Sequence, residues 1–224
     1  KIVVLTAALS VALSTQAAVV LDTFAAPPAA AGGHTIFNVG GFLNIVTPSA
    51  TVNGLPTPNS LSRTIVFSNT SGSGITRVDI NNAGDNNTDT GMLSLATDND
   101  VMGDLTVTWN NDGAGFGDIS ANPIVEFDVV AVDAAGGTAQ VNVVGNISGS
   151  TGVTAIAPGL RQFDLSTIPG LDLSAIQSIE AQMFAALGTD LQISEARLVP
   201  EPHEYALLAG LGLLGLAAYR RIRA

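Results

Sequence analysis

The chain has 224 residues, no cysteine, a formal net charge of −11 and a mean hydropathy of +0.40. The absence of cysteine excludes a disulfide framework, and one histidine outside the C-terminal tail, at position 34, is too few for a zinc site. Residues 19–199 carry four arginines against 17 acidic side chains, a net charge of −13, which opposes binding to nucleic acid or anionic lipid.

The N-terminus has the order of a secretory signal. Lys1 precedes the apolar run Ile2–Leu13, and the small-residue segment Ser14–Ala18 follows. This order predicts a signal peptide over residues 1–18, cleaved after Ala17 or Ala18. A transmembrane anchor is the alternative, but twelve apolar residues are too few to span a bilayer as a helix.

Residues 19–198 have the pattern of an all-β domain. Short runs alternate between apolar and polar residues, and clusters of Gly, Asn, Asp and Pro separate them. The proline-rich segment Thr47–Ser60 predicts a long loop, and Asp133–Gly137 predicts a hairpin between the two strands that flank it. The predicted strands are Val19–Phe24, His34–Val39, Arg63–Phe67, Gly74–Ile80, Met92–Thr97, Leu105–Trp109, Ile124–Val132, Ala139–Val144, Val153–Ile156 and Gln162–Leu165.

The segment from residue 173 to residue 198 has two interpretations. Apolar and polar residues alternate over most of it, which favours one helical turn at Leu173–Gln177 and then a hairpin of Ser178–Leu187 with Leu191–Leu198. A capping-box pattern at its start and a glycine after it favour a helix over Ala175–Leu187 instead.

Ten to twelve strands in a domain of this size predict two packed antiparallel sheets, a β-sandwich of the jelly-roll kind. The domain is flanked by the N-terminal signal helix and by a C-terminal hydrophobic helix. The predicted core takes the apolar member of each alternating run: Phe67, Val107, Trp109, Phe127, Val129, Val141, Val143 and Ile193.

Catalytic constellations are missing from the sequence pattern. His34 lies at a loop edge without a nucleophile elbow elsewhere, so serine catalysis is not expected. Glu126, Glu180 and Glu195 each lie on an alternating strand, where solvated outward faces explain them better than a glycosidase pair does. Trp109 alternates with threonines and is expected in the core. An exposed Trp109 that stacks on carbohydrate is the alternative. We expect that the protein is not an enzyme, and calcium is the one cofactor for which we weigh a site.

Calcium is the one cofactor for which the sequence offers a candidate. Asp85, Asn87 and Asp89 alternate in a loop, and clustered carboxylate and amide oxygens are what hard cations bind. Asp, Asn and Gly also stabilise turns, so an ordinary turn is the competing interpretation.

The C-terminal segment, residues 199–224, combines three features in a fixed order. Pro200-Glu201-Pro202 forms a rigid turn, Tyr205–Tyr219 is a 15-residue apolar run, and Arg220, Arg221 and Arg223 follow it. As a helix, a 15-residue run is short for a bilayer, which needs about 20 apolar residues. The arginines favour a cytoplasmic C-terminus. This segment resembles the PEP-CTERM sorting signal of Gram-negative bacteria.

The resemblance implies a location and partners. A protein of this kind is exported by the Sec machinery and processed by an exosortase-type membrane protease, passes through a membrane-bound precursor, and serves at the cell surface or in the extracellular matrix with exopolysaccharide. The alternatives are a protein similar to carbohydrate-binding modules, or a single-pass membrane protein that keeps its C-terminal helix.

The body also resembles the β-sandwich domains of PEP-CTERM proteins, through Asp22-Thr23-Phe24 in the first strand and Asp190–Ile193 in the last. Jelly-roll carbohydrate modules often hold a calcium ion between their first and last strands. That resemblance implies Asp22 and Asp190 as calcium ligands.

Overall fold

The computed structural model describes residues 18–24, 34–39, 47–52, 61–71, 75–80, 92–99, 101–110, 115–133 and 136–201, and helical backbone at 210, 212–216 and 218–219. Residues 1–17 of the predicted signal peptide lie outside these residues. The helical residues near the C-terminus fall within the predicted hydrophobic run.

The described part of the body consists of strands with one short 3-10 helix, η1, at Leu165–Thr167. The strands are β1 (Val19–Asp22), β2 (His34–Val39), β3 (Thr47–Val52), β4 (Leu61–Ser71), β5 (Ile75–Ile80), β6 (Leu93–Thr97), β7 (Met102–Asn110), β8 (Ile124–Val132), β9 (Gly137–Val144), β10 (Ser148–Ser150), β11 (Thr154–Ala155), β12 (Gly159–Asp164), β13 (Ser178–Ala185) and β14 (Asp190–Val199).

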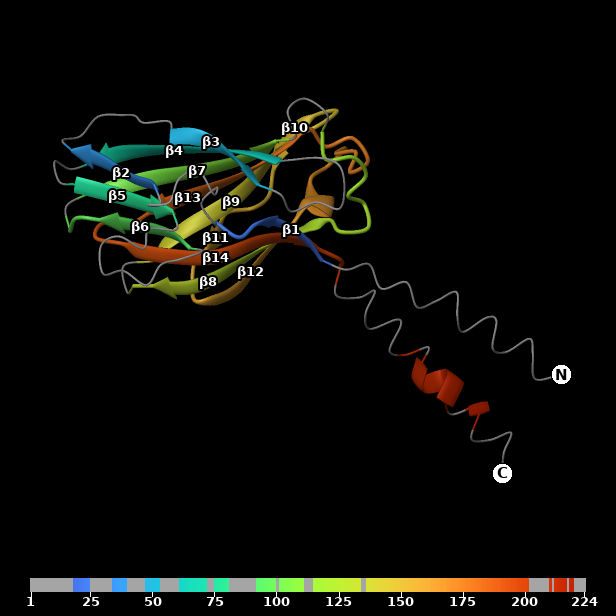
Figure 1. The fold of residues 1–224 in the computed structure, drawn as a ribbon. Coiled ribbons are helices and arrows are strands. Elements are labelled where there is room, and N and C mark those ends of the chain that lie inside the picture. Colours follow the sequence, from blue (N-terminus) through green and yellow to red (C-terminus); the bar gives the residue numbers. More distant parts are fainter. Residues whose placement is uncertain are drawn as a thin grey trace.

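The strands form two antiparallel sheets that face each other as a sandwich (Figure 1). We call the sheet with the order β12-β8-β14-β6-β5-β2 sheet A, and the sheet with the order β10-β9-β13-β7-β4-β3 sheet B. In sheet A, β8 follows one edge of β14 along its length, while β6 and β1 share the other edge in series. In sheet B, β11 also pairs with β9. The predicted antiparallel β-sandwich is therefore confirmed.

Period-two alternation determines which side chains enter the space between the sheets. In β13 every second residue is buried, and β7 behaves in the same way from Gly103 to Trp109. In β14 the alternation shifts at Ser194 and Glu195, where the register with β8 is irregular. This bulge lets Leu191 and Ile193 on one side of it and Ala196 and Leu198 on the other all face the core.

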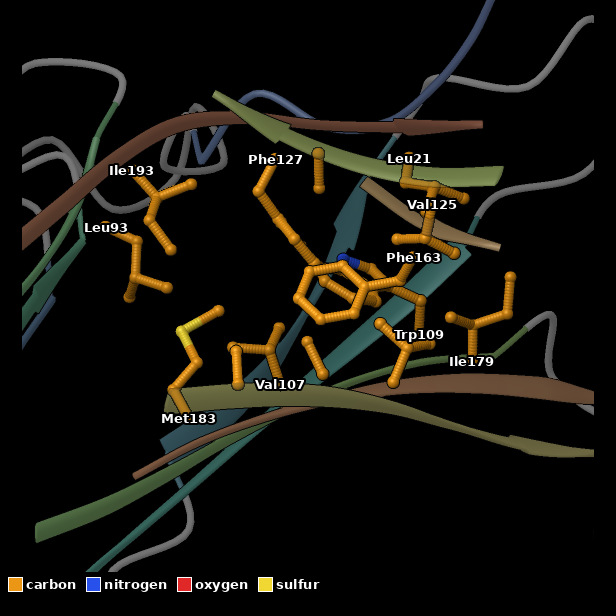
Figure 2. Close-up of a cluster of buried hydrophobic side chains, with 14 of the residues drawn as sticks. Leu21, Leu93, Val107, Trp109, Val125, Phe127, Phe163, Ile179, Met183 and Ile193 are labelled. Atoms are coloured by element: carbon orange, nitrogen blue, oxygen red, sulfur yellow. The ribbon is translucent and has the colours of Figure 1, made fainter. Parts of the chain in front are cut away.

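Aromatic rings lie at the centre of the core (Figure 2). The rings of Trp109 and Phe127 stack across the two sheets with centroids 6.2 Å apart, and Phe163 meets Phe127 edge-on at 5.7 Å. The eight predicted core residues are all buried: Phe67, Val107, Trp109, Phe127, Val129, Val141, Val143 and Ile193.

Both predicted hairpins are wrong. The strands β8 and β9 lie in different sheets, and so do β13 and β14, so each connection crosses from one sheet to the other. Alternation reports which face of a strand is buried but not which sheet contains it, since both sheets bury a face against the same core. The two crossing loops meet at Thr189, whose backbone N–H donates to Oγ1 of Thr97 and whose hydroxyl donates to the carbonyl of Gly136.

Three further expectations need correction. The segment Leu173–Gln177 has a turn at Leu173 and Ser174 and an isolated β-bridge at Ile176, and it contains no helical turn. The Asp172 carboxylate accepts from the backbone N–H and the hydroxyl of Ser174 and stabilises the turn. The alternative helix over residues 175–187 is also wrong, since β13 occupies that stretch. The predicted loop Thr47–Ser60 contains β3, where one proline is tolerated on an edge strand.

Candidate functional site

Polar side chains cover the outer face of sheet B where β9, β13 and β7 lie side by side. The register sets Asn142, Glu180 and Thr108 in one row across the three strands, and Gln140, Gln182 and Thr106 in the next. Neighbouring rows lie about 7 Å apart, and neighbouring strands about 4.8 Å apart. We call these six residues the polar face.

Hydrogen bonds connect these side chains to one another. The amide of Asn142 donates to Oε1 of Glu180 at 2.8 Å, and the hydroxyl of Thr108 donates to Oε2 at 3.3 Å. In the next row the amide of Gln140 donates to Oε1 of Gln182 at 2.9 Å. The amide of Asn142 also reaches that oxygen at 3.4 Å and links the two rows. All of these side chains are partly exposed, so a ligand can reach them.

The network sets which groups point to solvent. Because Oε1 of Gln182 accepts from both neighbours, its amide nitrogen is left to donate outward. The amide oxygens of Gln140 and Asn142 are left to accept. The row of Gln182 therefore presents an amide donor beside the acceptor of Gln140, whereas in the next row Asn142 and Glu180 both present acceptors.

A third row extends the polar face at one end. Phe184 lies between Thr138 of β9 and Asp104 of β7, and its ring is partly exposed although both of its chain neighbours are buried. Asp104 is partly buried in this row, and the resulting desolvation raises the pKa of its carboxyl group above the usual value. This end of the face thus joins an apolar ring to a carboxyl group.

Among the described residues, no cation lies on this face. Arg63 of β4 points into the core, and Arg77, Arg161 and Arg197 belong to strands of sheet A. We call the polar face together with Thr138, Phe184 and Asp104 the extended face. Its two carboxylates, Glu180 and Asp104, therefore have no cation beside them among the described residues.

The structure assigns Asp22 and Trp109, two of the residues singled out from the sequence, to the interior. Both are fully buried, and the indole N–H of Trp109 donates to Oδ2 of Asp22 at 2.9 Å. Arg63 donates to both oxygens of the same carboxylate at 2.8 and 2.9 Å, and the backbone N–H of Phe24 donates to Oδ1 at 2.7 Å. This contact holds Phe24 at a φ of 50°, in the left-handed region. We call these four residues the interior clamp, because it links β1 of sheet A to β4 and β7 of sheet B.

The clamp decides two expectations about ligands. Both oxygens of Asp22 are already hydrogen-bonded twice, and the ring of Trp109 has no exposed surface for a sugar. Asp190, the other expected calcium ligand from the strand pair, is exposed at the opposite end of β14. It lies six residues from Ala196, the partner of Asp22, or about 20 Å along the strand. The structure does not bring Asp22 and Asp190 together.

Asp190 instead lies near a second carboxylate, Asp133. Desolvation first, and the charge of Asp133 second, raise the pKa of Asp190. No group of three or more His, Cys, Asp or Glu in the described part of the chain is placed to hold a metal ion. The loop candidates Asp85, Asn87 and Asp89 lie outside the described residues.

The sorting motif is described only at its start. Pro200 is buried and Glu201 is partly exposed, while Pro202, Arg220, Arg221 and Arg223 lie outside the described residues. Leu213 and Leu214, on the helical backbone, are each 68% exposed. Within the described ranges, no helix is both long and apolar enough to cross a membrane.

The interior offers no room for a sugar at the hollow between β11 and β12. That hollow is lined by Arg161 and by apolar side chains, among them Phe127, Phe163 and Met183, and its volume of about 10 Å³ corresponds to about one water molecule. A polysaccharide would therefore have to meet the outside of the sandwich there.

Sequence reasoning identified the outward positions of the polar face but not the face itself. The alternation of Gln140 and Asn142, of Thr106 and Thr108, and of Glu180 is visible in the sequence. The expected hairpins paired β8 with β9 and β13 with β14, which would have separated these side chains. A search for alternating strands rich in Gln, Asn and Thr on the outward positions would have found them.

Comparisons with known proteins give a distant likeness. No protein-family model and no curated protein matches the chain. Among solved structures, the chain is similar to the family 11 carbohydrate-binding module of the cellulosomal cellulase Lic26A-Cel5E of Clostridium thermocellum, at 16% identity and a TM-score of 0.39, over 84% of this chain and 97% of that one. It is also similar to a family 11 module from Clostridium thermocellum in complex with a β-1,3-1,4-mixed-linked tetrasaccharide, at 15% identity and a TM-score of 0.37, over 82% and 95% of the two chains.

Proposed function

We propose that this protein is an exported, non-enzymatic β-sandwich that binds a polysaccharide through the polar face of sheet B. The polar face carries this proposal, because three adjacent strands present amide, hydroxyl and carboxylate groups in fixed orientations on a surface that solvent reaches. The likeness to carbohydrate-binding modules, at TM-scores of 0.37–0.39, adds no weight.

The chemistry of the face suits sugars. Each hydroxyl of a sugar donates and accepts, and the amide donor of Gln182 with the amide acceptors of Gln140 and Asn142 satisfies both roles. Phe184 offers an aromatic ring on which the apolar face of a sugar can stack. An extended chain of sugars can lie along the rows and contact several of these groups at once.

The spacing of the carboxylates supports binding over hydrolysis. Glu180 lies opposite Thr108, and Asp104 lies four residues along the same strand, about 13 Å away. A glycosidase needs its two carboxyl groups about 5–9.5 Å apart. No step of bond cleavage follows from this arrangement.

Export and sorting form part of the proposal and rest on the sequence of the two ends. The signal-like segment supports Sec export, and Pro200-Glu201-Pro202 with the apolar run and the arginines supports processing by an exosortase-type protease from a membrane-bound precursor. The product would reside at the cell surface or in the matrix. Mass spectrometry of the native protein should then show neither residues 1–18 nor the C-terminal arginines; an intact C-terminus would favour a single-pass membrane protein.

Affinity electrophoresis in gels that contain soluble polysaccharides tests the binding. We expect at least one polymer to retard the full-length chain, and Gln182→Ala to reduce that retardation. Gln192→Ala on β14 of sheet A is the matched control and should migrate as the unaltered protein does. A loss that follows Gln192→Ala instead would contradict the assignment to sheet B.

A purely structural matrix protein is the second candidate. The complete burial of Trp109 favours it, since the largest ring of the body then serves the core and not a ligand. Absence of retardation with every polymer would support this candidate.

A further inference from the structure

We infer that the polar face selects neutral polysaccharides and rejects acidic ones, an inference that rests on the proposed function. Its basis is the charge on the face together with the direction of each hydrogen-bonding group. The extended face carries the carboxylates of Glu180 and Asp104, and among the described residues no arginine or lysine accompanies them.

Glu180 is a fixed charge on β13, the central strand of the face. Both of its oxygens are held, one by the amide of Asn142 and the other by the hydroxyl of Thr108. These donors are neutral, so they orient the carboxylate without cancelling its charge. A ligand cannot displace Glu180 from its path without breaking both contacts.

The hydrogen-bond direction adds a second condition. A carboxylate only accepts, so the ligand group above Glu180 must donate. Sugar hydroxyls and the N–H of an acetamido group meet this condition, whereas a uronate carboxylate offers acceptors alone. A uronate there would bring two acceptors and two negative charges together.

The rest of the body reinforces the local effect. Residues 19–199 have a net charge of −13, and this field opposes the approach of a polyanion. At physiological ionic strength the field is screened beyond about 8 Å, so the fixed charge of Glu180 provides the discrimination at contact. A divalent cation such as calcium would bridge the carboxylates of the protein and of an acidic polymer, so the test has to exclude it with a chelator.

The test compares polymers that share a backbone and differ in charge. Affinity electrophoresis of the full-length chain would use hydroxyethyl cellulose against carboxymethyl cellulose, and fully methyl-esterified polygalacturonate against free polygalacturonate, at 150 mM salt with a chelator. We expect dissociation constants at least about tenfold lower for the neutral polymers. Glu180→Gln should bind the acidic polymers more tightly than the unaltered protein does. The ratio of the dissociation constants of acidic and neutral polymers should therefore decrease.

The control is Asp128→Asn on β8, which removes the same charge from the outer face of sheet A. It should leave the ratio unchanged, because only the long-range field differs. Equal or tighter binding of the acidic polymers, lost on Phe184→Ala, would overturn the neutral class while the polar face stands. Retention of no polymer, or retention that no change on sheet B affects, would overturn the proposed function as well.

Discussion

Glu126 on β8 and Glu180 on β13 lie on the outer faces of the two sheets, and their hydrogen-bond partners differ. On sheet A, Oε1 of Glu126 accepts from Arg197 at 2.6 Å and Oε2 accepts from Gln162 at 2.6 Å, and the side chain is nearly buried. On sheet B, Glu180 has only the neutral donors Asn142 and Thr108 and is partly exposed.

The difference shows what a carboxylate on a sheet can do. The hydrogen bond to Glu126 raises the pKa of Arg197, so the charged form of Arg197 is stabilised. The ion pair connects β14 to β8 within sheet A. Glu180 has two neutral donors and no cation among the described residues, and its side chain is partly exposed. The outer face of sheet A therefore contributes an ion pair to the fold, while the polar face of sheet B is the surface that we propose for binding.

We expect the largest effect on stability at the interior clamp, because its carboxylate and its cation are both buried. Arg63→Met leaves Asp22 buried with neutral donors alone, and we expect a loss of about 3–5 kcal/mol in the free energy of unfolding. Urea unfolding at neutral pH measures it. Asp128→Asn on the surface should cost under about 0.5 kcal/mol. Similar small losses for both variants would mean that the clamp does not stabilise β1.

Removing one donor from each outer-face glutamate compares the two sheets directly. Arg197→Met leaves the nearly buried Glu126 without its cation and should cost about 1–3 kcal/mol. Thr108→Val takes a donor from the more exposed Glu180 and should cost about 0.5 kcal/mol or less. Chemical denaturation of both variants measures the difference. Equal costs would remove the distinction between the two sheets.

Phe184→Ala compares the two sheets by their contribution to polysaccharide binding. Loss of the only aromatic ring identified on the polar face should weaken polysaccharide binding by up to about tenfold, at little cost in stability because the ring is partly exposed. Leu160→Ala removes an exposed apolar side chain, 53% accessible, from β12 of sheet A and is the matched control. A larger effect from the control would transfer the binding surface to sheet A.

The smallest effect concerns pH. Desolvation raises the pKa of Asp104 in the folded protein, so the folded state binds its proton more readily than the unfolded state does. The charged form therefore costs stability above the folded pKa, and that cost is relieved as the pH falls through it toward 3.8. Asp104→Asn should remove this relief, as thermal melting between pH 3 and 7 would show. An unchanged pH profile would contradict the desolvation of Asp104.

Discrimination between neutral and acidic polymers should follow the same titration. Protonation of Asp104 removes one of the two charges of the extended face, so the preference for neutral polymers should decrease at acid pH and persist at neutral pH. In Asp104→Asn the preference should be smaller at neutral pH and should vary less over this range.

The sequence by itself determined the class of the fold and the direction of most side chains. The inward positions of Phe67, Val107, Trp109 and Ile193 follow from period-two alternation, which is a local property of a strand. The buried glutamate Glu126 occupies an outward position of β8 as well, and its exposure is reduced by its neighbours and not by its direction.

Only the tertiary structure decided which strands are neighbours. Two sheets that bury their inner faces in one core impose the same alternation on every strand, so the pattern of β13 fits a partner in either sheet. The pairing depends on contacts between distant segments, as with Asp22 and Trp109, which are 87 residues apart. The polar face arises in the same way. Gln140, Gln182 and Thr106 come from three separate strands, and only the packing of the whole sandwich brings them into one row.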